Sequence, residues 1–78
     1  MKLVFKNSYG KEKELANVES REEAIKIMYD FMNEHNFKCY YIRTWHVNEG
    51  EVTPTRIAPA SYTCFDVGSH TEFFYLYD

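Results

Sequence analysis

The sequence lacks any apolar run near the ~20 residues that a membrane-spanning helix needs. Its opening, "MKLVFKNSYG", has neither the apolar stretch nor the small-residue cleavage site of a secretory signal. A glycine-rich phosphate loop is also missing, since Gly10, Gly50 and Gly68 each fall in a predicted turn. We therefore expect no membrane partner and a cytoplasmic location.

Cationic side chains are too few for a nucleic-acid-binding surface. The chain has 9 Lys and Arg against 12 Asp and Glu, a formal net charge of −3, whereas phosphate binding needs a dense cationic surface. Seven of the acids fall within residues 12–34: Glu12, Glu14, Glu19, Glu22, Glu23, Asp30 and Glu34. We expect one acidic face, which either keeps the protein soluble or complements a basic groove on a partner.

Cysteine and histidine are scarce and widely spaced. Cys39 and Cys64 have no neighbouring Cys or His at metal-binding spacing, so we expect reduced thiols packed as small hydrophobes. Only His70 has a close partner, Glu72, and nothing in the sequence supplies a third metal ligand. No motif supports a Cys–His nucleophile, and a chain of 78 residues has little room for a substrate cleft. We expect no metal, no cofactor and no enzymatic activity.

Aromatic residues, by contrast, are abundant: seven Tyr, six Phe and one Trp make up 18% of the chain. We treat residues 1–78 as a single domain, which at this size buries only roughly 60% of the surface that the unfolded chain exposes. In so small a fold the rings either fill the core or dominate an interface, where Tyr, Trp and Arg are the usual energetic anchors.

The first half of the chain predicts a hairpin followed by a helix. "KLVFK" and "KEKELANV" flank the turn "NSYG", and the charges of the second arm favour a sheet edge. Ser20 and Glu23 form a capping box, in which the Ser20 hydroxyl accepts from the Glu23 N–H and the Glu23 side chain returns to the Ser20 N–H. The helix should span roughly residues 21–35 and stop at a left-handed Asn36. Its apolar face comprises Ala24, Ile27, Met28, Phe31, Met32 and His35.

The second half predicts strands. "KCYYIRTWHV" (38–47) begins a second hairpin, whose return arm "EVTPTRIAP" (51–59) is an edge strand or an ordered loop because Pro54 and Pro59 cannot donate ladder hydrogen bonds. "ASYTCFDV" and "HTEFFYLY" flank Gly-Ser and form the last hairpin. The fold class is therefore α+β: an antiparallel sheet of about four to six strands with one amphipathic helix on one face, in a ββαβββ-like order.

Alternation along the strands separates two sets of side chains. In the last strand it puts Phe74 and Leu76 on the face that we expect beneath the helix, because they are purely apolar. Phe73, Tyr75 and Tyr77 then face solvent or a partner. The candidate partner-binding residues are the helix acids and the sheet aromatics: Glu22, Glu23, Asp30, Tyr41, Trp45, Phe73 and Tyr75.

Two function classes remain open. The first is a non-enzymatic binding module that docks on a protein through the acidic helix face or the aromatic sheet face. The second is a small-ligand or nucleotide-binding domain that stacks its ligand on Tyr41, Trp45, Phe73 and Tyr75. A homodimer formed through an open sheet face or an edge strand is compatible with both.

Three stretches together carry a resemblance: the opening "MKLVFKNSYGKEKE", the capped helix "SREEAIKIMYDFMNEHN" and the ending "DVGSHTEFFYLYD". In this format the whole chain resembles the small, acidic, aromatic-rich proteins of bacteriophages and other mobile elements, among them anti-CRISPR and other anti-defence inhibitors. Such proteins bind and block a host protein or sequester its signal molecule. The resemblance implies a protein inhibitor in the host cytoplasm, and it carries over no functional residue.

Overall fold

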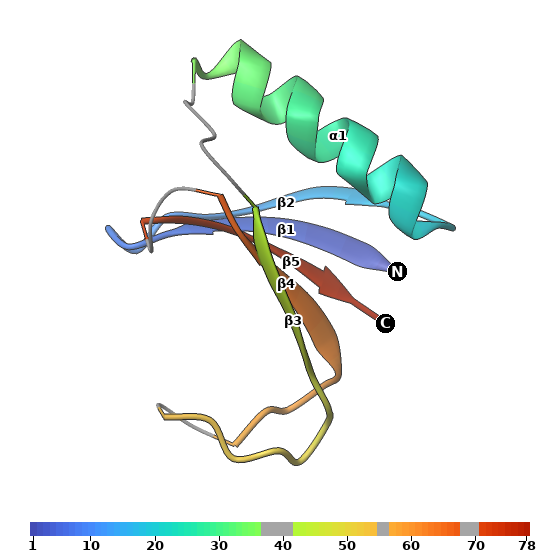
Figure 1. Ribbon diagram of the computed structural model, residues 1–78, viewed down its shortest axis with the longest axis vertical. Coiled ribbons are helices and arrows are strands. Elements are labelled where there is room, and N and C mark those ends of the chain that lie inside the picture. The colour runs from blue at the N-terminus through green and yellow to red at the C-terminus, as the bar shows by residue number, and fades with distance from the viewer. Residues whose placement is uncertain (37–41, 55–56, 68–70) are drawn as a thin grey trace.

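The fold has two layers, a five-stranded antiparallel sheet and one helix across one of its faces (Figure 1). The computed structural model describes residues 1–36, 42–54, 57–67 and 71–78. Within them the elements are β1 (Lys2–Asn7), β2 (Glu12–Asn17), α1 (Arg21–Glu34), β3 (Arg43–Val47), β4 (Tyr62–Asp66) and β5 (Glu72–Tyr77). The strand order is β2-β1-β5-β4-β3. The α+β class and the ββαβββ order predicted from the sequence are confirmed.

The N-terminal hairpin forms as predicted and places β2 at one edge of the sheet. Its turn is held by the side chain of Asn7, whose Oδ1 accepts from the backbone N–H groups of Tyr9 at 3.1 Å and Lys11 at 2.9 Å. Gly10 takes a φ of 89°, which a residue with a side chain rarely adopts. The pairing register shifts between Leu3 and Val4, which marks a bulge in this hairpin.

Helix α1 begins and ends close to the predicted positions. The Ser20 hydroxyl accepts from the Glu23 N–H at 3.1 Å, as expected of the N-cap. The other half of the predicted capping box is wrong, because Glu23 Oε2 accepts from the N–H of Glu19 rather than from that of Ser20. Asn36 has a φ of 56° and ends the helix in the predicted left-handed conformation. Among the described residues, no helix is long and apolar enough to cross a membrane.

The core lies between α1 and the sheet. Phe31 of the helix packs on Phe5 and Phe74 of the sheet, with ring centroids 4.8 and 5.7 Å apart. Phe74 and Leu76 are buried at this interface, which confirms their predicted place beneath the helix. His35 does not complete the buried face as predicted. It is exposed because α1 ends at Glu34, although its ring still lies against Phe31.

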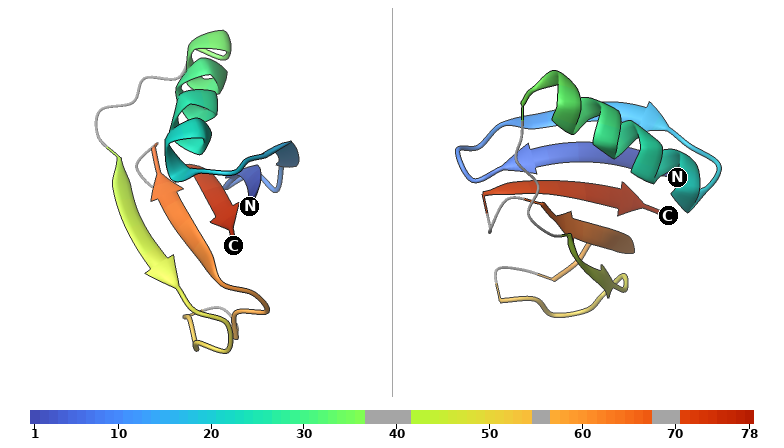
Figure 2. Two further views of the ribbon diagram at one scale, coloured as in Figure 1. Left: turned by 90° about the vertical axis from the view of Figure 1, so that its right-hand side faces the viewer. Right: turned by 45° about the horizontal axis from the view of Figure 1, so that its top comes forward.

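For the return arm 51–59 we predicted an edge strand or an ordered loop, and its described residues do not form the edge strand. β3 pairs with β4, from Arg43 opposite Asp66 to Val47 opposite Tyr62, and not with the described residues of the 51–59 segment. The segment between β3 and β4 instead leaves the sheet. Its described residues form an isolated bridge between Val52 and Ile57, and the Gly50 N–H donates to the Ala58 carbonyl at 2.9 Å. Pro54 and Pro59 lack the N–H groups that a ladder needs. Figure 2 shows this connection extending beyond the ends of β3 and β4.

Candidate partner-binding face

The sheet face turned away from α1 carries most of the remaining aromatic side chains, and we call it the aromatic face. Phe73, Tyr75 and Tyr77 of β5 lie at its centre and are partly buried. The strand register sets their neighbours in three rows across β3, β4, β5 and β1: Arg43–Asp66–Phe73–Lys6, Trp45–Cys64–Tyr75–Val4 and Val47–Tyr62–Tyr77–Lys2.

Ring stacking makes this face a continuous layer. Tyr75 stacks on Tyr62 with centroids 5.0 Å apart and planes at 30°, and on Tyr77 with centroids 6.2 Å apart. Phe73 meets Tyr75 edge to face, with centroids 6.5 Å apart. Stacked and edge-to-face pairs at these distances are the favoured aromatic geometries. The rings therefore hold one another in place, and little conformational freedom remains for a partner to remove.

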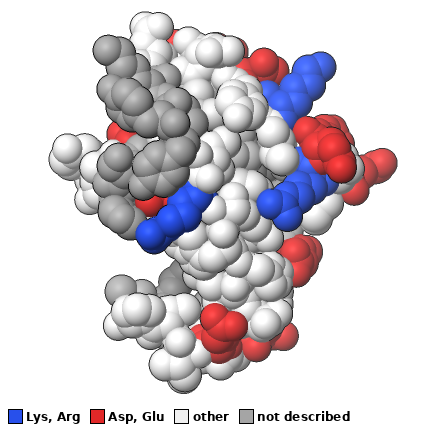
Figure 3. All heavy atoms as spheres, in the orientation of Figure 1, with Lys and Arg blue, Asp and Glu red and all other residues white. Residues whose placement is uncertain are grey.

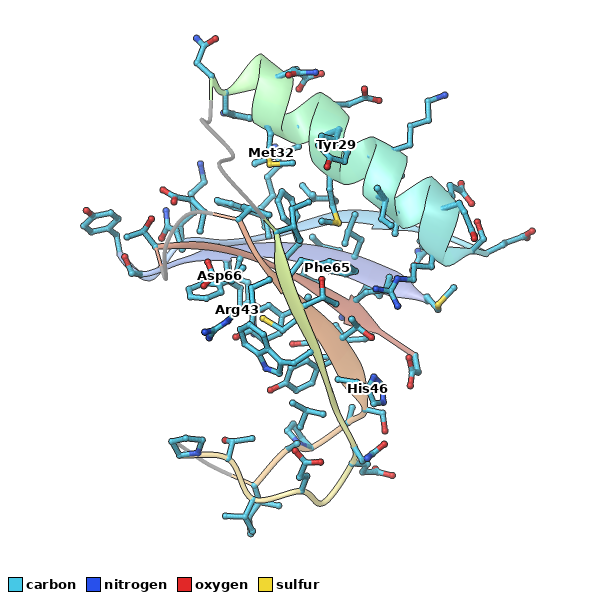
Figure 4. The ribbon with its side chains drawn as sticks, viewed as in Figure 1. Tyr29, Met32, Arg43, His46, Phe65 and Asp66 are labelled. Atoms are coloured by element: carbon cyan, nitrogen blue, oxygen red, sulfur yellow. The ribbon has the colours of Figure 1, made fainter. Side chains whose placement is uncertain are left out.

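Cationic side chains lie over these rings. Lys6 Nζ is 4.4 Å from the centroid of Tyr75, donates to the Tyr77 hydroxyl at 3.2 Å and lies 3.7 Å from a carboxylate oxygen of Glu12. At the other side of the sheet, the Arg43 guanidinium is 5.1 Å from the centre of the Trp45 ring; Figure 4 shows Arg43 beside the sheet. In such pairs the cation is attracted to the face of the ring, and the Lys6 ammonium is partly buried against the rings.

The connection between β3 and β4 covers part of the aromatic face. Ala58 is 2% exposed and packs in one cluster with Val47, Tyr62 and Cys64, and Figure 1 shows the connection on the side of the sheet opposite α1. Trp45 is left 36% exposed. The end of the face at Trp45, on β3, is therefore exposed.

The chemistry of Cys64 and Tyr75 is set by their burial. Burial raises the pKa of the Cys64 thiol to about 12, although a hydrogen bond from Tyr75 and nearby cations act in the opposite direction. Burial, followed by the proximity of Cys64, likewise raises the pKa of Tyr75 to about 12. Cys64 stays protonated at neutral pH, and a protonated buried thiol is a poor nucleophile.

The predicted site residues do not form one site. Trp45, Phe73 and Tyr75 share the aromatic face, which confirms the alternation, whereas the predicted acids Glu22, Glu23 and Asp30 are exposed on α1, across the sheet. On the side of the molecule shown in Figure 3, uncharged surface occupies the middle and charged side chains lie toward the margins. Several residues on which predictions rested lie outside the described residues: Cys39, Tyr41, Gly68, Ser69 and His70.

Two further features bear on ligand binding. A groove of about 220 Å³ runs between β2 and α1, with Leu15, Ile27 and Phe31 in its lining and Asp30 among the charged residues beside them. This volume is below the ~300 Å³ at which small-molecule sites usually begin. Within the part of the chain that the structure describes, no three His, Cys, Asp or Glu side chains gather as a metal site would require.

Sequence reasoning missed the residues that the register adds to the aromatic face. Lys6 and Tyr62 lie there together with Cys64, from strands far apart in the chain. A local signal existed, since alternation in "KLVFK" and "YTCFD" separates these residues from Phe5 and Phe65. Pairing between the strands, however, had to be known before the two alternations could be combined.

Comparisons of the chain with protein-family models, with curated proteins and with solved structures found no match.

Proposed function

We propose that this chain is a non-enzymatic binding protein that blocks a host protein by direct contact through the aromatic face. One observation carries the proposal: Trp45 and Arg43 lie at the uncovered end of a layer of stacked rings, on the sheet face that α1 does not cover. Trp, Tyr and Arg are the residues that most often dominate the energy of protein interfaces. Rings that are already held in place add contact area at little cost in entropy.

The chemistry of the face suggests the kind of surface that it meets. Arg43 and Lys2 are its exposed cations, one on β3 and the other on β1. Between them lie rings with hydroxyl groups that can donate hydrogen bonds. The complementary surface has an apolar side chain that contacts Trp45, with carboxylates around it that meet the two cations. The choice of a host defence protein as the target rests on the resemblance to phage-encoded inhibitors.

Affinity capture followed by measurement with the purified partner tests this proposal. We expect the immobilised chain to retain a stoichiometric protein from host lysate. Trp45→Ala should weaken binding to that purified protein by roughly 30-fold, the loss typical of a central aromatic anchor. Tyr9→Ala is the matched control, because Tyr9 is 86% exposed in the turn between β1 and β2, away from the ring layer. The absence of any stoichiometric partner, or equal affinity of the Trp45 and Tyr9 variants, would refute the proposal.

A nucleotide or another planar anionic ligand is the second candidate, favoured by the guanidinium of Arg43 beside the Trp45 ring. Such a ligand would stack on the indole and pair its charge with Arg43. Because Trp45 is the only tryptophan, its fluorescence reports directly on this event. An emission spectrum that stays unchanged across a panel of nucleotides rules out stacking there and leaves the protein-binding proposal in place.

A further inference from the structure

The two edges of the sheet differ in how they are protected. β2 presents Glu12, Lys13 and Glu14, and its hairpin contains a bulge; charges and bulges are the usual devices that prevent another strand from pairing with an edge. β3 has the sequence RTWHV, in which Arg43 is the only Lys, Arg, Asp or Glu, and its first four residues are exposed. It is rich in strand-forming residues and exposed on both faces. Among the described strands, β3 is therefore the edge open to pairing.

The peptide groups that β3 offers can be identified from the register. The Val67 N–H bonds to Glu72 and the Asp78 N–H to Ser61, which flank the β4–β5 ladder. Because hydrogen-bonded pairs alternate in an antiparallel ladder, the odd-numbered residues of β4 bond to β5 and the even-numbered ones to β3. Their partners on β3 are residues 43, 45 and 47. The peptide groups of Thr44 and His46 therefore point outward, away from β4.

We propose that β3 pairs antiparallel with β3 of a second copy of this chain, joining the two sheets into one across a two-fold axis at Trp45. In this register, Thr44 of each copy faces His46 of the other, and their outward peptide groups exchange hydrogen bonds. Trp45 faces its own counterpart in a non-hydrogen-bonded pair, where side chains approach most closely. The two indoles then adjoin on the aromatic face, which becomes continuous across the axis.

Charge complementarity favours a second copy over an unrelated strand. The register places Arg43 opposite Val47 of the other copy and diagonally beside the segment that follows, where Glu49 is exposed. Two such pairs form, one on each side of the axis, and no like charges face each other. Within one chain, Arg43 and Glu49 are six residues apart, roughly 20 Å along an extended strand. They can therefore meet only between copies.

Molar mass in solution tests the dimer, measured by sedimentation equilibrium at micromolar protein. We expect twice the monomer mass for the wild type and the monomer mass for Thr44→Pro. This proline removes an outward N–H and leaves the pairing with β4 intact, because proline is tolerated at a strand edge. Glu12→Pro makes the same change on the opposite edge and should remain a dimer. Circular dichroism checks that both variants are folded.

Charge reversal tests the register itself. Arg43→Glu and Glu49→Arg should each weaken the dimer by roughly tenfold, because two ion pairs become two repulsions. The double variant should regain the wild-type dissociation constant, since each new Glu again meets a new Arg. A monomeric wild type overturns the proposal, and so does a dimer that Thr44→Pro leaves intact. The dimer and the proposed partner binding can be tested separately. Thr44→Pro changes the strand edge that forms the dimer but retains the Trp45 side chain for the capture assay.

Discussion

The two faces of β5 show how one strand serves two purposes. Phe74 and Leu76 point toward α1 and are 0% and 3% exposed. Their neighbours in sequence, Phe73, Tyr75 and Tyr77, point the other way and stay partly accessible. Side chains without polar atoms are enclosed on one face, whereas most rings on the other have hydroxyl tips that can remain in water. The helix side of β5 is therefore the more completely enclosed, and the aromatic face keeps part of its surface exposed.

Truncating adjacent phenylalanines on the two faces is the strongest test of this comparison. Phe74→Ala should lower the free energy of unfolding by about 3–5 kcal/mol, because it leaves a cavity among rings packed on Phe5 and Phe31. Phe73→Ala removes the same ring from a partly exposed position, and about 1–2 kcal/mol is expected. Urea denaturation followed by circular dichroism measures both.

Each variant is the other's control, because the residues are neighbours on the same strand and the substitution is identical. Equal losses would show that both faces are cores of similar packing. That result would contradict the difference in packing between the two faces, on which the proposal of a binding surface depends. A loss for Phe74→Ala that leaves no folded state at all still agrees with the comparison, provided that Phe73→Ala folds.

Much of this division could be predicted from the sequence. The turn after β1, the Ser20 cap and the three- and four-residue spacing in α1 are local patterns, and each reappears in the structure. Alternation separated Phe74 from Phe73, and the purely apolar character of Phe74 and Leu76 assigned them to the helix side. These predictions succeed because the periods of strand and helix are properties of the backbone itself.

The connection between β3 and β4 was not predictable in the same way. Its prolines argued against a regular strand, but nothing local showed that β3 would pair with β4 or that Ala58 would pack on the far face of the sheet. Both facts depend on contacts between segments distant in sequence. The contribution of Lys6 to the aromatic face was hidden for the same reason, since it follows from the pairing of β1 with β5.

Alkaline pH should lower the stability of the fold through two groups of the aromatic face. The pKa of Cys64 is raised from 9.0 to about 12 and that of Tyr75 from 10.0 to about 12, both chiefly by burial. An acid whose pKa is higher in the folded state loses its proton first in the unfolded state. The stabilisation is therefore complete below pH 9 and is lost as the pH rises toward 12. The urea midpoint, measured at increasing pH, should fall across this window.

The Cys64→Val variant isolates the thiol, because valine fills a similar space and has no proton to lose. In this variant Tyr75 is the only one of the two groups left, so the fall in the urea midpoint should begin nearer pH 10. A midpoint that does not change between pH 9 and 11 in the wild type would contradict the burial of both groups. A variant curve that coincides with that of the wild type would assign the effect to Tyr75 and other groups, and not to Cys64.

The smallest expected effect concerns the cation over the rings. Lys6→Met keeps the apolar stem on Tyr75 and loses the cation–aromatic contact, the hydrogen bond to the Tyr77 hydroxyl and the ion pair with Glu12, so about 0.5–1 kcal/mol of unfolding free energy should be lost. Glu12→Gln removes only the ion pair, whose carboxylate is exposed, and should cost less than about 0.5 kcal/mol. The Glu12 loss should disappear in high salt, whereas most of the Lys6 loss should persist because the ammonium is partly buried against the rings. If Lys6→Met costs no more than Glu12→Gln at every salt concentration, Lys6 does not stabilise the ring layer, and the rings are held by stacking alone.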